Sequence, residues 1–169
     1  HTSKFKDAFG RLCQDSVDKI FILTDETTHR LCRPILKQWP MLEDATDIVI
    51  PPTDVHKNIE TTTTVWSALG HGGASRHSLL ICLGGGMVTD LGGFAASTFK
   101  RGIRFVNIPT TLLAMVDAAV GGKTGINFEG LKNEVGVFNE SAIVVIDTEF
   151  LRTLDKSNML SGYAEMLKH

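Results

Sequence analysis

The stretch ICLGGGMVTDLGGFAAS, residues 81–97, joins two apolar segments through three consecutive glycines. The first segment predicts a buried strand over 78–86, and the second predicts a helix over 88–99. In a parallel sheet, such a strand-to-helix turn lies at the carboxyl edge, where open α/β sheets bind their ligands. Glycines there let the backbone approach a phosphate, which the helix N-terminus attracts. The stretch is therefore a candidate phosphate-binding turn, although it lacks the GxGxxG spacing of the usual dinucleotide-binding motif.

A purely structural interpretation of the same glycines stays open at this point. Three glycines also permit a tight turn that needs no ligand. Asp90, which falls in the first turn of the expected helix, would then only interact favourably with the helix dipole. The surrounding sequence has to decide between the two interpretations.

Strand and helix patterns alternate around this stretch. The expected strands cover residues 19–25, 46–52, 78–86 and 103–111, and the expected helices cover 26–39, 58–74 and 88–99. Pro34 is a defect in the first of these helices. Strands spaced by helices indicate βαβ units, and hence a parallel sheet covered on both faces. The sequence therefore predicts an α/β fold.

The pattern changes after residue 110. Residues 111–122 look helical, 123–138 predict a hairpin or an irregular excursion, and 142–154 predict one more strand and a short helix. A last helical pattern opens at Ser157, and the chain stops inside it. Because a finished domain would cap its final helix, we expect a fragment whose continuation has been removed.

Composition narrows the class of protein. The chain has 169 residues, about one domain, with 43% hydrophobic and 21% charged residues and a formal net charge of −2. This balance argues against a nucleic-acid partner. The apolar runs are too short for a membrane span, and no secretory signal is visible. The three cysteines are odd in number and far apart, so we expect idle thiols in a cytoplasmic protein.

A second stretch, PTTLLAMVDAAVGGKTGIN (109–127), carries candidate polar groups. Thr110 and Thr111 can cap the segment that follows, which includes Asp117, and two glycines then present Lys123. A carboxylate and an ammonium group around a Gly-Gly turn suit a phosphorylated, hydroxylated substrate. A surface ion pair on a mobile loop would produce the same pattern. The later pair Lys132 and Asn133 is, by itself, equally compatible with a solvated loop.

The chain ends with GYAEMLKH (162–169). On a helix, Glu165 and His169 share a face, which makes metal ligation conceivable. Two ligands do not make a site, however, and the other histidines show no metal-binding spacing. Spacing alone therefore does not predict a metal site.

Taken together, these segments resemble a known family. The block GGGMVTDLGGFAASTFKRGIRFVNIPTTLLAMVDAAVGGKTGIN (84–127), followed by KN and GYAEMLK, closely resembles the amino-terminal half of the 3-dehydroquinate synthases. The resemblance runs from about residue 20 to the end of the chain. It implies a Rossmann-like NAD-binding domain over 1–147 and, over 148–169, the first helix or helices of a truncated helical domain. It also implies an NAD- and metal-dependent cyclisation of 3-deoxy-D-arabino-heptulosonate 7-phosphate to 3-dehydroquinate, with release of phosphate.

The resemblance assigns a set of residues to the NAD site. Asp25 is expected to bind the adenosine ribose, and the three glycines are expected to hold the pyrophosphate. The remaining residues implied for this site line the same pocket. The full set is Asp25, Gly84, Gly85, Gly86, Asp90, Thr110, Thr111, Lys132, Phe150, Thr153 and Leu154.

Other residues are implied for the substrate and the metal. Asp117 is expected beside the nicotinamide, while Lys123 and Asn133 are expected to hold the phosphorylated sugar-acid substrate. Arg101 would reach the phosphate in the neighbouring subunit's site, which implies a homodimer in the full-length protein. Glu165 would be one of three ligands of a divalent metal, usually zinc, and Lys168 would contact the substrate. The residues concerned are Arg101, Asp117, Lys123, Asn133, Glu165 and Lys168.

The sequence departs from the family pattern in two ways. The family usually has a Gly-Glu-x-x-Lys turn that contacts the cofactor, whereas this chain has Thr53, Asp54 and Lys57 in PTDVHK. We expect Asp54 and Lys57 to keep the contact. Both histidine ligands of the family's metal lie beyond this sequence, so we expect the 169-residue chain to be inactive by itself.

Three alternatives remain beside this assignment. Other sugar-phosphate cyclases of the same superfamily are hard to exclude, because the residues that distinguish them lie largely outside this chain. Glycerol-type dehydrogenases share the GGG loop but match DAAVGGKTGIN poorly. A lone nucleotide-binding module without catalysis is disfavoured by the final helix that stops without a cap.

Overall fold

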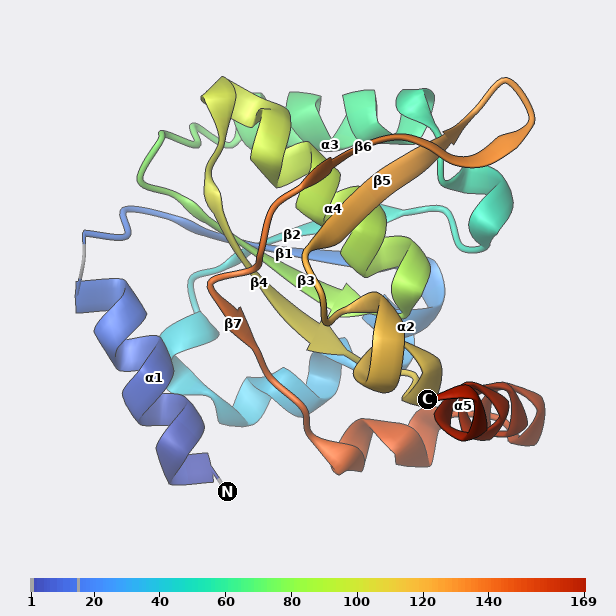
Figure 1. Cartoon of the computed structure of the whole chain (residues 1–169). Coiled ribbons are helices and arrows are strands. Elements are labelled where there is room, and N and C mark those ends of the chain that lie inside the picture. The colour runs from blue at the N-terminus through green and yellow to red at the C-terminus, as the bar shows by residue number, and fades with distance from the viewer. Residues whose placement is uncertain (1, 15) are drawn as a thin grey trace.

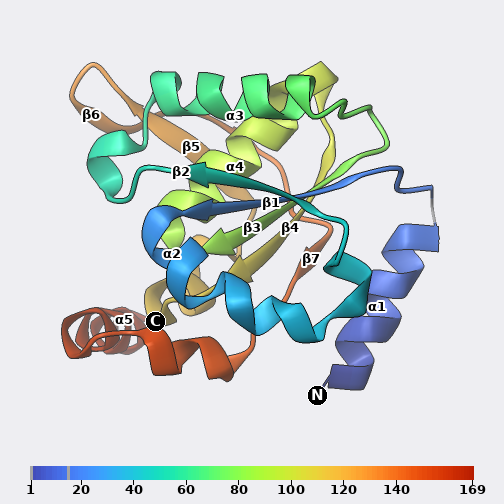
Figure 2. The ribbon, with the colours of Figure 1, turned by 180° about the vertical axis from the view of Figure 1, so that it is seen from behind.

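A five-stranded, all-parallel sheet organises the molecule. The computed structural model describes residues 2–14 and 16–169, and Figures 1 and 2 show it from two opposite sides. The strands stand in the order β2-β1-β3-β4-β7. Their bounds are β1 (Ile20–Asp25), β2 (Thr46–Ile50), β3 (Leu79–Gly84), β4 (Arg104–Pro109) and β7 (Ile143–Val144). The chain builds the sheet outward from β1 to β2 and then from β3 to β7, so the order reverses between β1 and β3. This is the topological switch point at which doubly wound folds bind ligands.

Helices and short turns cover both faces of the sheet, as the βαβ pattern predicts. On one face lie α3 (Ile59–His71), α4 (Gly86–Thr98) and a two-stranded antiparallel sheet of β5 (Lys123–Phe128) and β6 (Leu131–Phe138) (Figure 1). The other face carries α1 (Thr2–Gln14), η1 (Arg33–Gln38), η2 (Pro40–Leu42) and η6 (Thr148–Thr153) (Figure 2). The predicted α/β fold is confirmed.

Alternate side chains of each strand divide between two hydrophobic cores. Leu80 and Cys82 of β3 join the core beneath α3 and α4, whereas Leu79, Ile81 and Leu83 join the core beneath α1 and η6. All five side chains are fully buried. Burial on both faces explains why this strand reads as a continuous apolar run in the sequence.

The glycine stretch is confirmed as a strand-to-helix junction, with boundaries that differ from those expected. Strand β3 ends at Gly84, Gly85 is the N-cap, and α4 begins at Gly86, two residues earlier than predicted. A Cβ on Gly84 would lie 2.6 Å from the Cβ of Val88 in the first turn of the helix. A side chain at residue 84 would therefore push this turn away from the strand.

The segment after β4 contains an unusual turn. The helix expected over 111–122 is wrong in length and type, because the structure has a π-helix, η5 (Ala114–Ala118), at this place. Such single π-turns occur frequently at functional sites. The hairpin expected over 123–138 is confirmed as β5 and β6, and the last helix as α5 (Lys156–Lys168). Figure 1 shows α5 beside η5.

Two further differences concern the first forty residues. Helix α1 has no counterpart among the elements expected from the sequence; its Phe5 ring packs 4.3 Å from that of Trp39. The helix expected over 26–39 is broken into α2 (Glu26–Leu31) and the 3-10 helix η1, which carries Pro34 near its start. Proline has no N–H to donate, so an α-helix cannot continue through it without a kink. The remaining short 3-10 turns are η3 (Asp54–His56) and η4 (Phe99–Arg101).

None of the helices in the described parts of the chain is long and apolar enough to cross a membrane.

Candidate cofactor and substrate site

Several of the predicted site residues meet at the carboxyl edge of the sheet, beside the switch point. A cavity of about 690 Å³ opens there between the start of α4, the η5 turn and the β5–β6 hairpin. Four of the predicted residues line it: Asp90, Asp117, Lys123 and Asn133. Asp90 and Asn133 thus line the same cavity, although they lie 43 residues apart in the sequence.

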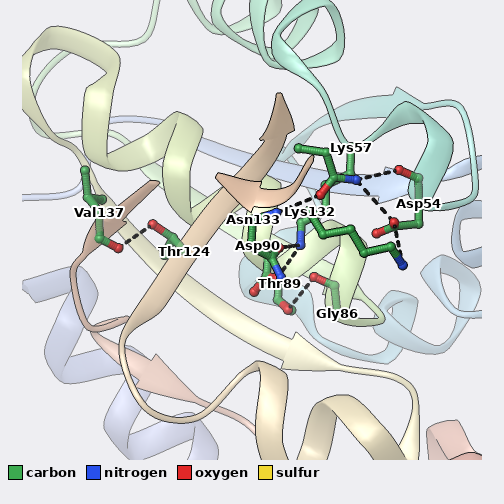
Figure 3. Close-up of polar contacts among 10 residues, drawn as sticks. Asp54, Lys57, Gly86, Thr89, Asp90, Thr124, Lys132, Asn133 and Val137 are labelled. Atoms are coloured by element: carbon green, nitrogen blue, oxygen red, sulfur yellow. Dashed lines mark hydrogen bonds and ion pairs between the residues drawn. The ribbon is translucent and has the colours of Figure 1, made fainter. Parts of the chain in front are cut away.

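The centre of the site is a buried ion pair. The Nζ of Lys57 donates to Asp90 Oδ2 and to Asn133 Oδ1, each at 2.6 Å. The Lys57 side chain is 5% exposed and that of Asp90 is 21% exposed. Figure 3 shows Lys57, Asp90 and Asn133 converging from three segments of the chain. Lys57 therefore joins the start of α4 to the hairpin.

The carboxyl group of Asp90 is influenced by two opposing effects. Burial raises its pKa, and the nearby carboxylates Asp117 and Asp54 raise it as well. The charge and hydrogen bond of Lys57 lower it, but the net shift remains upward. Asp90 is thus a partly desolvated acceptor rather than a first-turn acid facing water, so the purely dipolar interpretation of this residue is wrong.

The three glycines do not need glycine's backbone freedom. Gly85 has φ −77° and ψ −170°, and none of Gly84, Gly85 and Gly86 has a positive φ. A Cβ on Gly85 would meet the side chain of Thr111 at 3.1 Å, and one on Gly86 would meet Ala118 at 3.1 Å. The constraint at Gly85 and Gly86 is therefore the limited space beside Thr111 and Ala118 rather than a turn conformation.

No side chain caps the N-terminus of α4 in the described structure. The first N–H groups of a helix have no intrahelical acceptor, and the helix dipole favours negative charge at this position. The start of α4 can therefore accept a phosphate group at the edge of the cavity.

A second group of predicted residues lies at the ends of β1 and β4. Asp25 caps α2, since its Oδ1 accepts from the Thr28 N–H at 2.7 Å. The thiol of Cys32 lies 3.5 Å from Thr153 Oγ1 and also interacts with Thr110. Burial raises the pKa of this thiol, which fits the inert role expected for it. Cys32 thus lies close to three of the predicted residues: Asp25, Thr110 and Thr153.

Two members of the predicted cofactor set differ in exposure. Phe150 is fully buried in the core beneath η6. Leu154, which follows η6, is half-buried.

The Gly-Gly turn presents its lysine as expected. Gly121 has φ +114° and Gly122 has φ +70°, conformations that L side chains rarely adopt. The turn leads directly into β5, and both Lys123 at its end and Asp117 before it are exposed at the cavity. The backbone conformation therefore favours glycine at these two positions, whereas it does not at Gly84, Gly85 and Gly86.

The loop before α3, in which the sequence departs from the family pattern, contains a residue in a strained conformation. Thr53 has φ +77°, in the region that favours glycine, and it stands where the family usually has glycine. Asp54 lies 3.4 Å from Lys132 and accepts from Asn127 at 3.2 Å. The loop thus delivers Lys57 to the site at the expense of a strained threonine.

Glu165 lies in a three-residue cluster that the spacing alone does not predict. One ligand atom each from Asp117, Glu165 and His169 lies within 4.8 Å of the other two. His169 Nε2 is 3.4 Å from Glu165 and 3.8 Å from Asp117, and Lys168 is 3.5 Å from Glu165. Two carboxylates and an imidazole are a donor set suited to zinc. The π-turn η5 therefore brings Asp117, a third potential metal ligand, to Glu165 and His169.

Arg101 is not brought together with the other residues. It follows α4 and precedes β4, so it lies at the amino edge of the sheet, opposite the cavity. It lines a separate hollow with Arg76, His77 and Lys100, and it has a positive φ of 65°. Within one copy of this chain, Arg101 cannot reach the cavity without unfolding the elements between them.

One residue of the site is absent from the sequence-based set. Asn127 of β5 donates from its backbone N–H to the Lys57 carbonyl at 2.8 Å, and its side chain contacts Asp54 and Asn133. It follows the buried Ile126 in GKTGIN, and only its polarity in a half-buried strand marks it in the sequence.

Comparison with known proteins connects this geometry to a family. A 3-dehydroquinate synthase from Parabacteroides distasonis is 59% identical over 90% of this chain and 43% of its own length. A 2-epi-5-epi-valiolone synthase from Streptomyces hygroscopicus, solved with NAD+ and Zn2+ bound, is 37% identical with a TM-score of 0.81. That match covers 89% of this chain and 42% of the other.

A 2-deoxy-scyllo-inosose synthase, solved with a phosphorylated carbasugar, NAD+ and Co2+, shares the fold with a TM-score of 0.84 at 24% identity. That match covers 91% of this chain and 43% of the other. The chain spans less than half the length of each of these three proteins. The sequence profile described as the 3-dehydroquinate synthase amino-terminal region matches residues 47–161. Because this match covers more than half of the sequence, the chain belongs to the 3-dehydroquinate synthase family.

Proposed function

We propose that this chain is the NAD-binding part of a 3-dehydroquinate synthase. The reaction would be the cyclisation of 3-deoxy-D-arabino-heptulosonate 7-phosphate to 3-dehydroquinate with release of phosphate. Residues 1–147 would form the NAD-binding domain, and 148–169 would begin the domain that completes the active site. The single observation that carries the proposal is the Lys57–Asp90–Asn133 network, which borders a cavity next to a helix start that no side chain caps.

The residues present fit NAD. Gly85 and Gly86 present no side chain at the uncapped start of α4, where a pyrophosphate would bind. Asp90 uses Oδ2 for Lys57, so Oδ1 remains to accept from a ribose hydroxyl. Asp25, Thr110, Thr111, Lys132, Thr153 and Leu154 would line the cofactor, with Phe150 behind them. NAD, when bound, supplies the hydride acceptor that makes elimination of phosphate possible and later returns the hydride.

The substrate would occupy the cavity. Lys123 would hold its phosphate as a point charge. Asn133 uses Oδ1 for Lys57, so its Nδ2 remains to donate to a carboxylate or hydroxyl oxygen. Lys168 would contact the substrate from α5, and Arg101 would act on the phosphate in a second copy's site, as part of a homodimer. The position of Arg101 at the far edge of the sheet supports a role between copies.

A related cyclase is the second candidate. The 2-epi-5-epi-valiolone synthase matches with 37% identity and a TM-score of 0.81, which supports a related activity as the alternative. Assay of the whole protein with both substrates distinguishes the two candidates.

The NAD site is tested by calorimetric titration of NAD into this chain and its Asp90→Asn variant. The variant removes the charge that pairs with Lys57, and hydrogen bonds to charged groups contribute about 1.5–3 kcal/mol. We therefore expect an affinity loss of about 10- to 100-fold. Asp44→Asn, an exposed change on the turn before β2, is the matched control and should bind as the wild type does.

Failure to bind NAD would contradict the proposal only if the chain is folded. Circular dichroism and thermal unfolding establish this. A chimera that joins this chain to the carboxyl-terminal part of the Parabacteroides distasonis relative supplies the second wall of the site. If the folded chimera also fails to bind NAD, the proposed function is wrong.

Glu165 would be a metal ligand, and Asp117 and His169 lie close enough to join it. A divalent metal, when bound, polarises substrate hydroxyls. Co2+ titration followed by visible absorption tests the site. Since loss even of a residue that supports a ligand costs about 10- to 100-fold in metal affinity, we expect Glu165→Gln to lose at least as much. Glu149→Gln, at an exposed residue of η6, is the control, and an equal loss there would contradict the assignment.

A further inference from the structure

Asn127 is connected to three of the predicted site residues by hydrogen bonds. Its backbone N–H donates to the Lys57 carbonyl at 2.8 Å. Its Nδ2 donates to Asp54 at 3.2 Å, both to the backbone carbonyl and to Oδ2. Its Oδ1 accepts from the backbone N–H of Asn133 at 3.0 Å. One half-buried side chain thus joins the loop before α3 to the strand β6.

The hairpin is irregular at this residue. The ladder of β5 and β6 changes register between Ile126 and Phe128, so Asn127 stands opposite residues 132–134. Asn133, in the middle of this bulge, has φ +54°, which costs energy for a residue other than glycine. A bulged residue does not pair its backbone N–H with the neighbouring strand. The Asn133 N–H therefore donates to Asn127 Oδ1 instead.

The bulge determines the direction of a functional side chain. Asn133 Oδ1 accepts from Lys57, and Asn133 also lines the cavity. Figure 3 shows Asp54, Lys57, Asp90 and Asn133 gathered in one place, with Lys132 beside them. Without the bond from Asn127, the Asn133 N–H would lose its partner and the left-handed conformation would lose its support. Lys57 would then lose one of its two acceptors.

We propose that Asn127 is a positioning residue of the site, which holds the Asp54–Lys57 loop and the left-handed Asn133 in register. The inference rests on the proposed function, since NAD binding is one of its readouts. Asn127 acts through Asp54, Lys57 and Asn133 and does not itself line the cavity.

Two variants separate this role from general stability. Asn127→Leu removes every side-chain bond of the residue. Asn127→Asp keeps an acceptor for Asn133 but places a second carboxylate 3.2 Å from Asp54 Oδ2. Like charges at this distance raise the pKa of the pair, so one carboxyl holds a proton at low pH and can donate to the other. The other charges that face the pair are Lys132, 3.4 Å from Asp54, and the Lys57–Asp90 ion pair.

NAD affinity is measured for each variant relative to the wild type, from about pH 5 to pH 8. Asn127→Leu is expected to lose about 10- to 100-fold at every pH, the effect of misplacing binding groups by about 1 Å. Asn127→Asp should lose as much at pH 8 but recover toward the wild type as the pH falls to 5. Asn139→Leu and Asn139→Asp are matched controls at the end of the same hairpin, where the side chain donates to Ser97 at 2.8 Å. They should bind NAD as the wild type does.

Hydrogen exchange of the Asn133 amide provides a readout that does not depend on NAD. It should accelerate in Asn127→Leu and remain unchanged in Asn139→Leu. If neither the folded wild type nor the folded chimera binds NAD but this acceleration is seen, the proposed function fails and the positioning role stands. If the Asn133 amide exchanges equally in both leucine variants, or if Asn127→Asp loses NAD affinity to the same extent at every pH, the positioning role is wrong.

Discussion

Replacement of Lys57 by methionine is expected to lower the free energy of unfolding by about 3 kcal/mol or more. Removal of one partner of a buried ion pair typically costs about 3–5 kcal/mol, because the other charge is left without compensation. Here the Lys57 side chain is 5% exposed, and its loss leaves Asp90 and Asn133 without their donor. Urea unfolding, monitored by circular dichroism, measures the change. NAD affinity should fall at the same time, since the Asn133 side chain loses its orientation.

The variant should also show a characteristic pH dependence. Burial already raises the pKa of Asp90 above the usual value of 3.8, and loss of the Lys57 charge removes the main opposing effect. The folded state then binds a proton more tightly than the unfolded state does. The unfolding free energy of Lys57→Met should therefore fall, relative to the wild type, as the pH rises from about 4 toward the raised pKa. Above that pKa the full loss is present.

Two further variants identify the cause. The double variant that combines Lys57→Met with Asp90→Asn has no isolated buried charge. Relative to Lys57→Met alone, it should recover part of the stability and lose the additional pH dependence. Lys37→Met, at an exposed residue of η1, controls for loss of a positive charge and should change stability by less than about 0.5 kcal/mol. If Lys57→Met also changes the free energy of unfolding by less than about 0.5 kcal/mol and keeps the wild-type pH profile, the role given to the ion pair is wrong.

The sheet could be predicted from the sequence because its strands are buried on both faces. Leu79 to Leu83 form an uninterrupted apolar run, and the glycines that follow mark the junction with a helix. The positions of proline and glycine then predict most of the other helix and strand ends to within a few residues. Local patterns of this kind are sufficient for the α/β class and for the position of the edge that binds ligands.

The arrangement inside the site depends on contacts that local patterns do not contain. Lys57 lies 33 residues from Asp90 and 76 from Asn133, and only the folded hairpin brings them together. The π-turn that places Asp117 beside Glu165 differs from an α-helix in its hydrogen bonds and not in its apolar spacing. Helix α1 does not stand out in the sequence for another reason: its large apolar side chains Phe5, Phe9 and Leu12 are set in a segment rich in polar residues. Its packing against the rest of the core therefore stabilises it more than its own composition does.

At the glycine junction, a substitution is expected to weaken NAD binding while leaving the stability of the fold largely unchanged. Gly85→Ala should weaken NAD binding by about 2 kcal/mol or more, roughly 30-fold, which is the typical cost of an extra methyl group in a filled site. The fold should tolerate the change, because Gly85 has an ordinary φ of −77° and a Cβ there meets only the side chain of Thr111 at 3.1 Å. Calorimetric titration of NAD and urea unfolding measure the two quantities on the same sample.

Gly84→Ala is the matched control, one residue earlier in the same turn. Its Cβ would lie 2.6 Å from the Cβ of Val88, which is fully buried in the core and cannot move aside. Such overpacking typically costs about 1–3 kcal/mol of stability. A structural turn without a ligand would show the reverse result at Gly85, with no greater loss of NAD affinity than of stability. Since the backbone at Gly85 is open to any residue and a Cβ there would meet only the Thr111 side chain, a loss of NAD affinity larger than the loss of stability would point to a group that approaches from outside the chain.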